Sequence, residues 1–281
     1  MTRAVSARTL DEAVRFLRDD PELRPVAGCT DLMVCEPEAR ADLPAVLDLL
    51  SIPELSGISE AENGALDIGA TTSFTRIRRS QLIGDRYPAL AEAAGLIGGW
   101  QIQNRATLGG NIANASPAGD SLPVLLALRA EIVAVGANGR RLIPYRDFHT
   151  DYRRTALEPG ELIAAIRLPE PPPLSSQLFR KVGTREAQAI SKVVVALLAV
   201  VEEGVFTTFR LAAGSVAATP VRLTRAEETA AGQPVGLSTA EAIGRAAAAS
   251  VEPIDDVRST AGYRRFALER VVRRMALQLS E

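Results

Sequence analysis

The feature that most constrains this chain is a proline cluster at residues 169–176, PEPPPLSS. Proline lacks a backbone N–H and its ring fixes φ, so this segment can continue neither an α-helix nor a central β-strand. The chain has 281 residues, which is enough for more than one hydrophobic core. The cluster therefore predicts a boundary between two domains, which we expect at residues 1–172 and 176–281.

Both helices and strands are expected around this boundary. Residues 131–148 predict a hairpin, because Asn138-Gly139 suits a type I′ turn. Residues 87–98 have a helical pattern, and residues 189–217 predict two long strands around a Glu-Gly turn. The fold class that follows is α+β.

Helix starts are marked by Ser or Thr followed three residues later by Glu, a pattern in which the hydroxyl caps the first turn. The pattern occurs at Thr9, Thr224 and Ser238, so we expect these residues to cap helices. The last helix carries five arginines that we place on its polar side, where such residues typically face solvent; contact with a partner is the alternative. They are Arg264, Arg265, Arg270, Arg273 and Arg274.

Charge and cysteine content argue against several classes of function. The formal net charge is −2 and the isoelectric point is about 5.7, which does not indicate a surface for nucleic acid or an anionic membrane. No apolar run approaches the roughly 20 residues of a membrane-spanning helix, and the N-terminus lacks the apolar core of a signal peptide. Two cysteines, Cys29 and Cys35, and a single histidine do not predict a metal site. We expect two reduced thiols in a cytoplasmic protein.

Two glycine-rich segments are candidates for binding phosphate. They are residues 25–32, PVAGCTDL, and residues 107–111, TLGGN, which lie inside the stretch 106–123 where neither helix nor strand is expected. Glycine lets a backbone approach a ligand closely and turn successive N–H groups toward one point. The two segments would suit the two halves of a pyrophosphate, although tight turns alone would also explain them. Neither the Rossmann fingerprint nor the P-loop motif is present.

Four segments, in order along the chain, resemble the FAD-binding subunit of the molybdenum hydroxylases, the family of xanthine dehydrogenase and carbon monoxide dehydrogenase. They are VAGCTDLM, QIQNRATLGGNIANASPAGDSLPVLLAL, FRKVGTREAQAISKV and DDVRSTAGYRRFALERVVRRM. The resemblance covers nearly the whole chain. It implies a two-lobed FAD-binding domain of the vanillyl-alcohol-oxidase/p-cresol-methylhydroxylase type, followed by a smaller C-terminal α/β domain.

The resemblance also implies which residues contact FAD. The first segment supplies Pro25, Val26, Ala27, Gly28, Cys29, Thr30, Asp31 and Leu32. The second supplies Thr107, Leu108, Gly109, Gly110 and Asn111. Further contacts, on the flavin side, are Ile97, Asp120, Ile163 and Lys181. The family pattern has glycine where this chain has Cys29, so the substitution raises the question whether residue 29 has a positive φ.

Several of these residues have a simpler structural alternative. Asp120 precedes an apolar helix and could be its N-cap. Lys181 could be a solvated strand residue, whereas its functional role would be a positive charge near the isoalloxazine that stabilises reduced flavin. Cys29 is expected to pack rather than react. His149 is expected to be structural, because members of the family bind FAD noncovalently.

The function that the resemblance implies is electron transfer within an oxidoreductase. Electrons would reach FAD from a [2Fe–2S] small subunit, after substrate oxidation at a molybdenum cofactor on a large subunit, and would leave to NAD or another acceptor. A dimer of heterotrimers and a purine-type substrate are expected, and no residue of this chain is expected to be an acid–base catalyst. The alternatives are a self-sufficient flavoprotein oxidoreductase and a flavin-free structural subunit.

Overall fold

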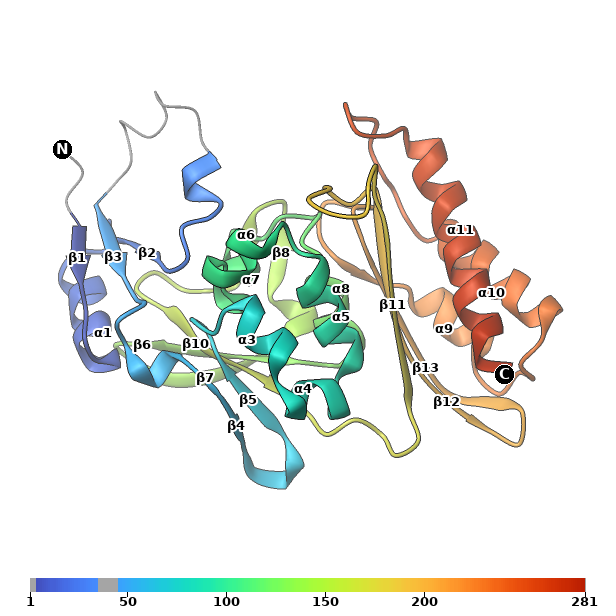
Figure 1. Cartoon of the computed structure of the whole chain (residues 1–281), viewed down its shortest axis with the longest axis horizontal. Coiled ribbons are helices and arrows are strands. Elements are labelled where there is room, and N and C mark those ends of the chain that lie inside the picture. Colours follow the sequence, from blue (N-terminus) through green and yellow to red (C-terminus); the bar gives the residue numbers. More distant parts are fainter. Residues whose placement is uncertain (1–3, 35–44, 281) are drawn as a thin grey trace.

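The structure is a computed structural model and describes residues 4–34 and 45–280. Figure 1 shows three blocks in a row. A small sheet with one helix lies at one end, a larger sheet covered by short helices lies in the middle, and a long-stranded sheet backed by the last helices lies at the other end.

The first block is a parallel sheet with strand order β1-β3-β2. Its elements are β1 (Ala4–Ser6), α1 (Leu10–Asp19), β2 (Arg24–Val26) and β3 (Val46–Asp48). The Thr9 hydroxyl caps α1 as predicted, because it accepts a hydrogen bond from the Glu12 N–H at 3.2 Å. Ala13 and Leu17 of α1 are buried in a core that includes residues of the middle sheet.

The middle block is an antiparallel sheet with strand order β4-β5-β10-β6-β7. Its strands are β4 (Ile58–Glu60), β5 (Leu66–Gly69), β6 (Glu131–Gly136), β7 (Gly139–Pro144) and β10 (Leu162–Leu168). The helices over it are α3 (Phe74–Arg79), α4 (Gln81–Arg86), α5 (Pro88–Leu96), α6 (Trp100–Arg105), α7 (Leu108–Asn114) and α8 (Leu122–Ala127). A small hairpin is formed by β8 (His149–Asp151) and β9 (Arg154–Thr155).

Short 3₁₀ turns occur along the whole described chain: η1 (Leu32–Val34), η2 (Pro53–Leu55), η3 (Glu62–Gly64), η4 (Tyr145–Asp147) and η5 (Gln278–Ser280).

The predicted hairpin is present, but its turn differs from the predicted type. Gly136 pairs with Gly139, so the two turn residues are Ala137 and Asn138 rather than Asn138 and Gly139. Of these three positions only Gly139 has a positive φ, of 106°. A two-residue type I′ turn needs positive φ at both central residues, so Gly139 instead occupies the left-handed position that follows the turn.

The third block begins after the proline cluster. It contains β11 (Ser176–Val182), β12 (Val193–Glu202), β13 (Val205–Gly214), β14 (Val221–Arg222), α9 (Thr224–Ala230), α10 (Leu237–Ala248) and α11 (Ala261–Leu277). Alternate residues of β12 enter different cores: Val193 and Val195 pack with α9–α11, whereas Val194 and Ala196 pack with the helices of the middle block. This sheet is therefore buried on both faces and joins the two domains.

Three local predictions are wrong. Residues 108–114 form a helix, because Thr107 caps the first turn while Leu108 and Ile112 are buried in the core. Thr224 and Ser238 do not cap their helices, which have Leu223 and Gly236 at the capping positions.

No helix among the described residues is long and apolar enough to cross a membrane.

Candidate functional site

A cleft of about 1740 Å³ opens where residues of all three blocks meet. Of the residues predicted to contact FAD, all but Leu108 and Lys181 line it. Leu108 is fully buried in the core of the middle block. Lys181 lies behind Asp120, as its hydrogen bonds described below indicate. Two glycine-rich segments that are about 80 residues apart in the sequence thus meet at one cavity.

The first segment presents free backbone donors to the cleft. Among the described residues, no partner accepts a hydrogen bond from the N–H groups of Gly28, Cys29, Thr30, Asp31 or Leu32. Cys29 has a φ of 58°, so the left-handed conformation that glycine would favour is adopted here by cysteine. Successive N–H groups around a left-handed residue form a concavity that suits an anion. The Cys29 thiol donates to the Ala27 carbonyl, and burial raises its pKa, which keeps it protonated and unreactive.

The second segment is the start of α7 rather than a loop, and the N–H groups of Leu108, Gly109, Gly110 and Asn111 already have acceptors. The N–H of Leu108 donates to Thr72 O at 3.1 Å and that of Gly109 to Ala70 O at 2.9 Å. The N–H of Gly110 donates to the capping Thr107 hydroxyl at 3.1 Å. This segment therefore contributes mainly shape to the cleft, while most of the N–H groups without an acceptor among the described residues lie on the first segment.

Two of the glycines at the cleft allow a close approach of the backbone to its neighbours, and a third does not. A Cβ on Gly28 would overlap the carbonyl group of Arg105, so Gly28 lets the first segment touch the residues just before α7. A Cβ on Gly109 would lie 2.6 Å from Ala70 Cβ, whereas one on Gly110 would meet only the Thr107 hydroxyl, at 2.9 Å. Gly28 and Gly109 are therefore needed for packing, and Gly110 is the glycine beside open cleft.

Asp120 connects the two domains at the cleft wall. Lys181 Nζ on β11 donates to Asp120 Oδ2 at 2.5 Å and to the Leu96 carbonyl at 3.0 Å. The Ser191 hydroxyl donates to Asp120 Oδ1. Burial raises the pKa of the Asp120 carboxyl, and Lys181 and Ser191 oppose that rise. Asp120 does not cap α8: the capping position is Ser121, whose side chain makes no capping hydrogen bond.

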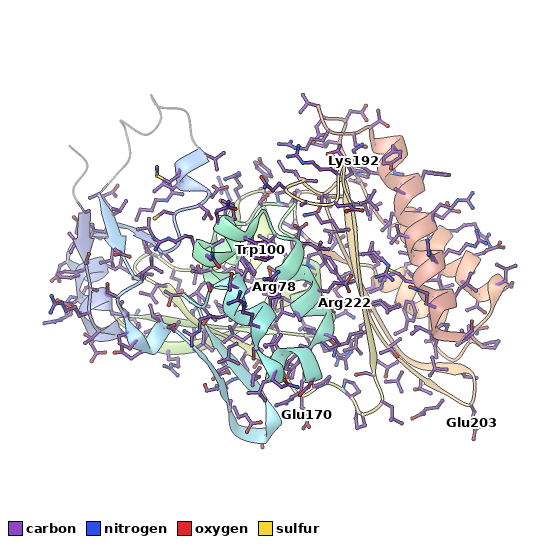
Figure 2. All side chains as sticks on the ribbon, viewed as in Figure 1. Arg78, Trp100, Glu170, Lys192, Glu203 and Arg222 are labelled. Atoms are coloured by element: carbon purple, nitrogen blue, oxygen red, sulfur yellow. The ribbon has the colours of Figure 1, made fainter. Side chains whose placement is uncertain are left out.

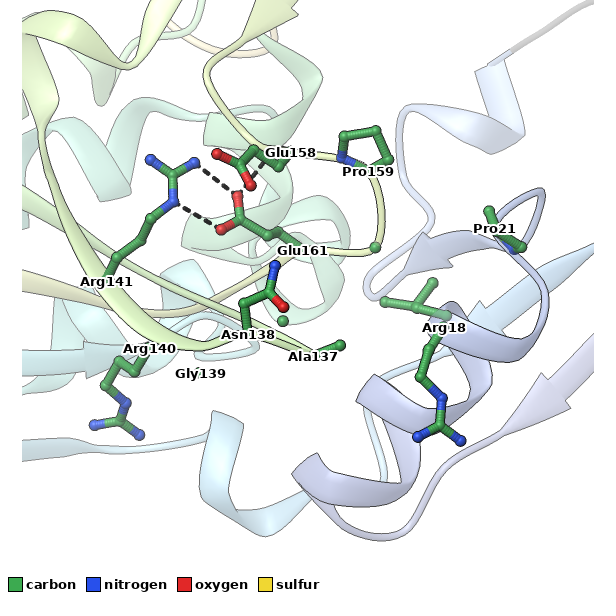
Figure 3. Close-up of a pocket in the computed structure, with 13 residues that line it drawn as sticks. Arg18, Pro21, Ala137, Asn138, Gly139, Arg140, Arg141, Glu158, Pro159 and Glu161 are labelled. Atoms are coloured by element: carbon green, nitrogen blue, oxygen red, sulfur yellow. Dashed lines mark hydrogen bonds and ion pairs between the residues drawn. The ribbon is translucent and has the colours of Figure 1, made fainter.

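A second ion pair supports the strand that carries Ile163. Figure 3 shows Arg141 of β7 pointing at Glu161, with two hydrogen bonds of 2.7 Å between guanidinium and carboxylate. Glu161 lines both the main cleft and a smaller cavity of about 280 Å³, the one drawn in Figure 3, beside α1. The guanidinium lowers the pKa of the Glu161 carboxyl. This pair holds the entry to β10 against β7, next to the cleft.

His149 does not line the cleft, and its ring packs beside α7. Its Nε2 lies 3.1 Å from the Ile112 carbonyl of α7, and its ring contacts Tyr145 and Phe148 edge-on. Burial lowers the pKa of the imidazole, so it is neutral near neutral pH. No group of three or more His, Cys, Asp or Glu side chains within the described ranges could hold a metal ion.

The third block supplies a wall of the cleft that was not predicted. Ile190, Ser191, Ser215, Asp256 and Arg264 all line it. Arg264 was expected on the polar side of the last helix, but it is 4% exposed and donates to the carbonyls of Lys192 and Ser215 and to Asp256. The sequence alone does not distinguish the buried Arg264 from the exposed Arg265 beside it. The residues that pack around the helix decide which of the two points inward.

The cleft fits the FAD that the sequence predicts. Free N–H groups around the left-handed Cys29 suit a pyrophosphate without a basic side chain. The cleft is also larger than the roughly 300–1,000 Å³ of ordinary small-molecule sites, as an extended dinucleotide requires.

Residues 1–171 match the family described as the FAD binding domain in molybdopterin dehydrogenase, and residues 178–279 match the CO dehydrogenase flavoprotein C-terminal domain. The chain is 33% identical to the xanthine dehydrogenase FAD-binding subunit of Escherichia coli O157:H7, over 96% of this chain and 92% of that protein. It is 30% identical to the carbon monoxide dehydrogenase medium chain of Afipia carboxidovorans, over 92% of this chain and 89% of that one. Among solved structures, a carbon monoxide dehydrogenase from Hydrogenophaga pseudoflava superposes with a TM-score of 0.94 at 29% identity, covering 99% of this chain and 98% of that chain.

Proposed function

This chain belongs to the FAD-binding subunits of the molybdenum hydroxylases, as its four sequence segments predict, and we propose that it passes electrons from an iron–sulfur partner through FAD to NAD or another acceptor. It is a subunit of an FAD-dependent oxidoreductase, and its mixed α/β fold with two domains is the one predicted. The domains that we propose are residues 1–172 and 176–281, separated by the proline cluster.

The observation that carries the proposal is the run of N–H groups from Gly28 to Leu32, at one side of the cleft, that have no acceptor within residues 4–34 and 45–280. These groups would hold the FAD pyrophosphate, with Thr107 and Gly110 shaping the opposite side. Asp120, Ile97 and Ile163 would lie along the flavin ring. Bound FAD would supply the redox chemistry, since flavins accept electrons singly and release them in pairs.

The residues of this chain bind and orient the cofactor and set the electrostatics around it. Lys181 does not line the cleft, so its charge would act on the flavin through Asp120. The side chains of Asp120 and Lys181 are each 8% exposed. Because little water surrounds them, their charges interact more strongly with a neighbouring group than they would at the surface. No side chain is required to exchange protons with a substrate, because the substrate would react on another subunit.

An exposed apolar rim around the cleft supports a partner that covers it. Val34, Ile102, Tyr152, Ile190 and Ile254 line the cleft and are also exposed to solvent. Exposed apolar side chains gathered around one cleft are typical of interaction sites. We propose that the iron–sulfur subunit docks here, because an electron donor must lie close to the flavin.

Trp100 stands beside this rim. It is 70% exposed, and the Arg78 guanidinium lies 5.5 Å from the ring centroid; Figure 2 shows the two residues together on the helices of the middle block. Exposed aromatic and arginine side chains are typical of interface centres.

The remaining features of the assembly are proposals from the family. We propose a dimer of heterotrimers that also contains a molybdenum-cofactor large subunit, located in the cytoplasm. A purine-type substrate is proposed because NIANASPAGDS resembles the purine-oxidising members more than the carbon monoxide branch.

The decisive experiment measures flavin binding and electron transfer by the purified chain. We expect one noncovalent FAD, released by acid precipitation and bound more tightly than FMN, which has no pyrophosphate. The flavinated chain should reduce an artificial dye with NADH, if NAD is its acceptor, but should oxidise no purine until the iron–sulfur and molybdenum chains are added. Purine oxidation by this chain alone would favour a self-sufficient oxidase, and failure to bind FAD would favour a structural subunit.

A further inference from the structure

The Asp120 carboxylate is held on the cleft wall by two residues of the other domain. Lys181 occupies Oδ2 and Ser191 occupies Oδ1, and Ser191 is only 1% exposed. Asp120 and Ser191 line the cleft, whereas Lys181 does not. A ligand in the cleft therefore meets the carboxylate and the hydroxyl first, with the ammonium group behind them.

The other polar groups around Asp120 are already engaged. On α5 the Leu96 carbonyl accepts from Lys181, and on α7 the Asn111 side chain accepts from the Ser121 hydroxyl at 2.7 Å. On α11, Arg264 is bonded to Asp256 and to backbone carbonyls. Within the described part of the chain, Lys181 is therefore the only charged side chain bonded to Asp120, and the pair is neutral while Asp120 is ionised.

We propose that Asp120 takes up one proton when the cofactor in the cleft is reduced, and that Ser191 is a positioning residue that sets the pH range of this uptake. The inference rests on the proposed function, because it requires FAD in the cleft. Negative charge added near a buried carboxylate disfavours its ionised form. The electrons come from the iron–sulfur donor, the proton comes from water, and the bond that forms is O–H on Asp120.

Two opposing effects make this carboxylate suited to proton uptake. Burial already raises the pKa of Asp120, while the hydrogen bonds from Lys181 and Ser191 favour the carboxylate. Negative charge on a reduced cofactor in the cleft would act in the same direction as burial and favour the protonated carboxyl. Removing the Ser191 hydroxyl removes one of the two donors, so the pKa of Asp120 rises in both oxidation states and proton uptake moves to higher pH.

The test is the pH dependence of the flavin midpoint potential, measured on the FAD-loaded chain by titration with mediator dyes. An extra proton taken up on reduction makes the potential fall more steeply with pH between the two pKa values of Asp120. We expect this steeper window in the unmodified chain and in Ser191→Thr, which keeps the hydroxyl. We expect it to move to higher pH in Ser191→Ala and to be absent in Asp120→Asn. Ser59→Ala is the matched control, because Ser59 is exposed and does not line the cleft.

The outcomes separate this inference from the proposed function. A chain that binds no FAD would refute the proposed function itself. If FAD binds but the unmodified and Asp120→Asn profiles are parallel at every pH, Asp120 takes up no proton and the inference is wrong. If Asp120→Asn does not fold, Ser191→Ala decides, because an unshifted window in that variant contradicts the role of Ser191.

Discussion

The α-carbon of Gly28 lies against the carbonyl group of Arg105 so closely that a Cβ atom would overlap it. This contact joins the first glycine-rich segment to the residues that lead into α7, and it involves backbone that cannot move aside. We expect Gly28→Ala to lower the free energy of unfolding by about 1–3 kcal/mol, the usual effect of overpacking, and to weaken FAD binding. Urea denaturation and a flavin titration would measure both.

Gly262→Ala is the control for this substitution. Gly262 lies in α11 with no atom within 4 Å of an added Cβ, so alanine should stabilise the helix by up to about 1 kcal/mol. Equal effects of the two substitutions would show that the Gly28 contact is not needed.

Gly109 and Gly110 should separate folding from binding. The Cβ atom of Gly109→Val would clash with the Cβ and carbonyl oxygen of Ala70, so we expect a destabilisation of about 1–3 kcal/mol. Gly110→Val displaces only the Thr107 hydroxyl, so the expected loss is about 1 kcal/mol, the value of an N-cap, together with loss of FAD binding. A folded Gly110→Val chain that binds FAD normally would remove Gly110 from the proposed site.

Lys181→Met should leave Asp120 buried without its cation. Breaking a buried pair in this way costs about 3–5 kcal/mol, so the variant should unfold at lower urea concentration. Its Asp120 carboxyl would have a folded pKa still further above the unfolded value, so the variant should regain stability as pH falls. The double variant Lys181→Met/Asp120→Asn should be more stable at neutral pH than Lys181→Met alone; an additive double variant would contradict the coupling.

Arg141 and Glu161 predict the opposite dependence on pH. The pKa of Glu161 is lowered in the folded chain, so its contribution to stability is present above the unfolded pKa and is lost as pH falls through the folded pKa. Arg141→Met should remove about 1 kcal/mol at neutral pH, since the pair is partly exposed, and less in acid. Thermal melting at several pH values would reveal the effect, and a pH-independent loss would argue against it.

His149 should contribute to acid sensitivity. Burial lowers the pKa of the folded imidazole below the unfolded value, so its contribution to stability is present above the unfolded pKa and is lost as pH falls through that value toward the folded pKa. His149→Gln keeps a donor for the Ile112 carbonyl but does not titrate. We expect a flatter dependence of the melting temperature on acid pH in this variant, with FAD still bound. An unchanged pH dependence would show that His149 is not responsible.

Local signals in the sequence were sufficient for much of the fold. The two long strands β12 and β13 and the hairpin at residues 131–148 depend on short-range preferences, and both features are where they were expected. The four family segments predicted the FAD-binding subunit, a relationship that the family matches confirm. The roles of individual cofactor-binding residues stay predictions.

Tertiary packing decided what these local signals could not. Residues 108–114 are poor helix formers, yet they form α7 because Leu108 and Ile112 are buried against distant strands. Thr224 matches the capping pattern but leaves it unused, since Glu227 is instead bonded to Arg222 and to the Leu211 N–H. Ser238 also leaves the pattern unused, because α10 begins one residue earlier, at Leu237. Likewise Lys181 meets Asp120 only once the two domains pack together. Arg264 turns inward because Lys192 and Ser215, which are distant from it in the sequence of the same domain, supply its acceptors together with Asp256. A sequence specifies the local preferences of neighbouring residues. The partner of a buried charge comes instead from a segment that is distant in the sequence, because the fold decides where the charge is buried and a partner there must compensate for its lost hydration.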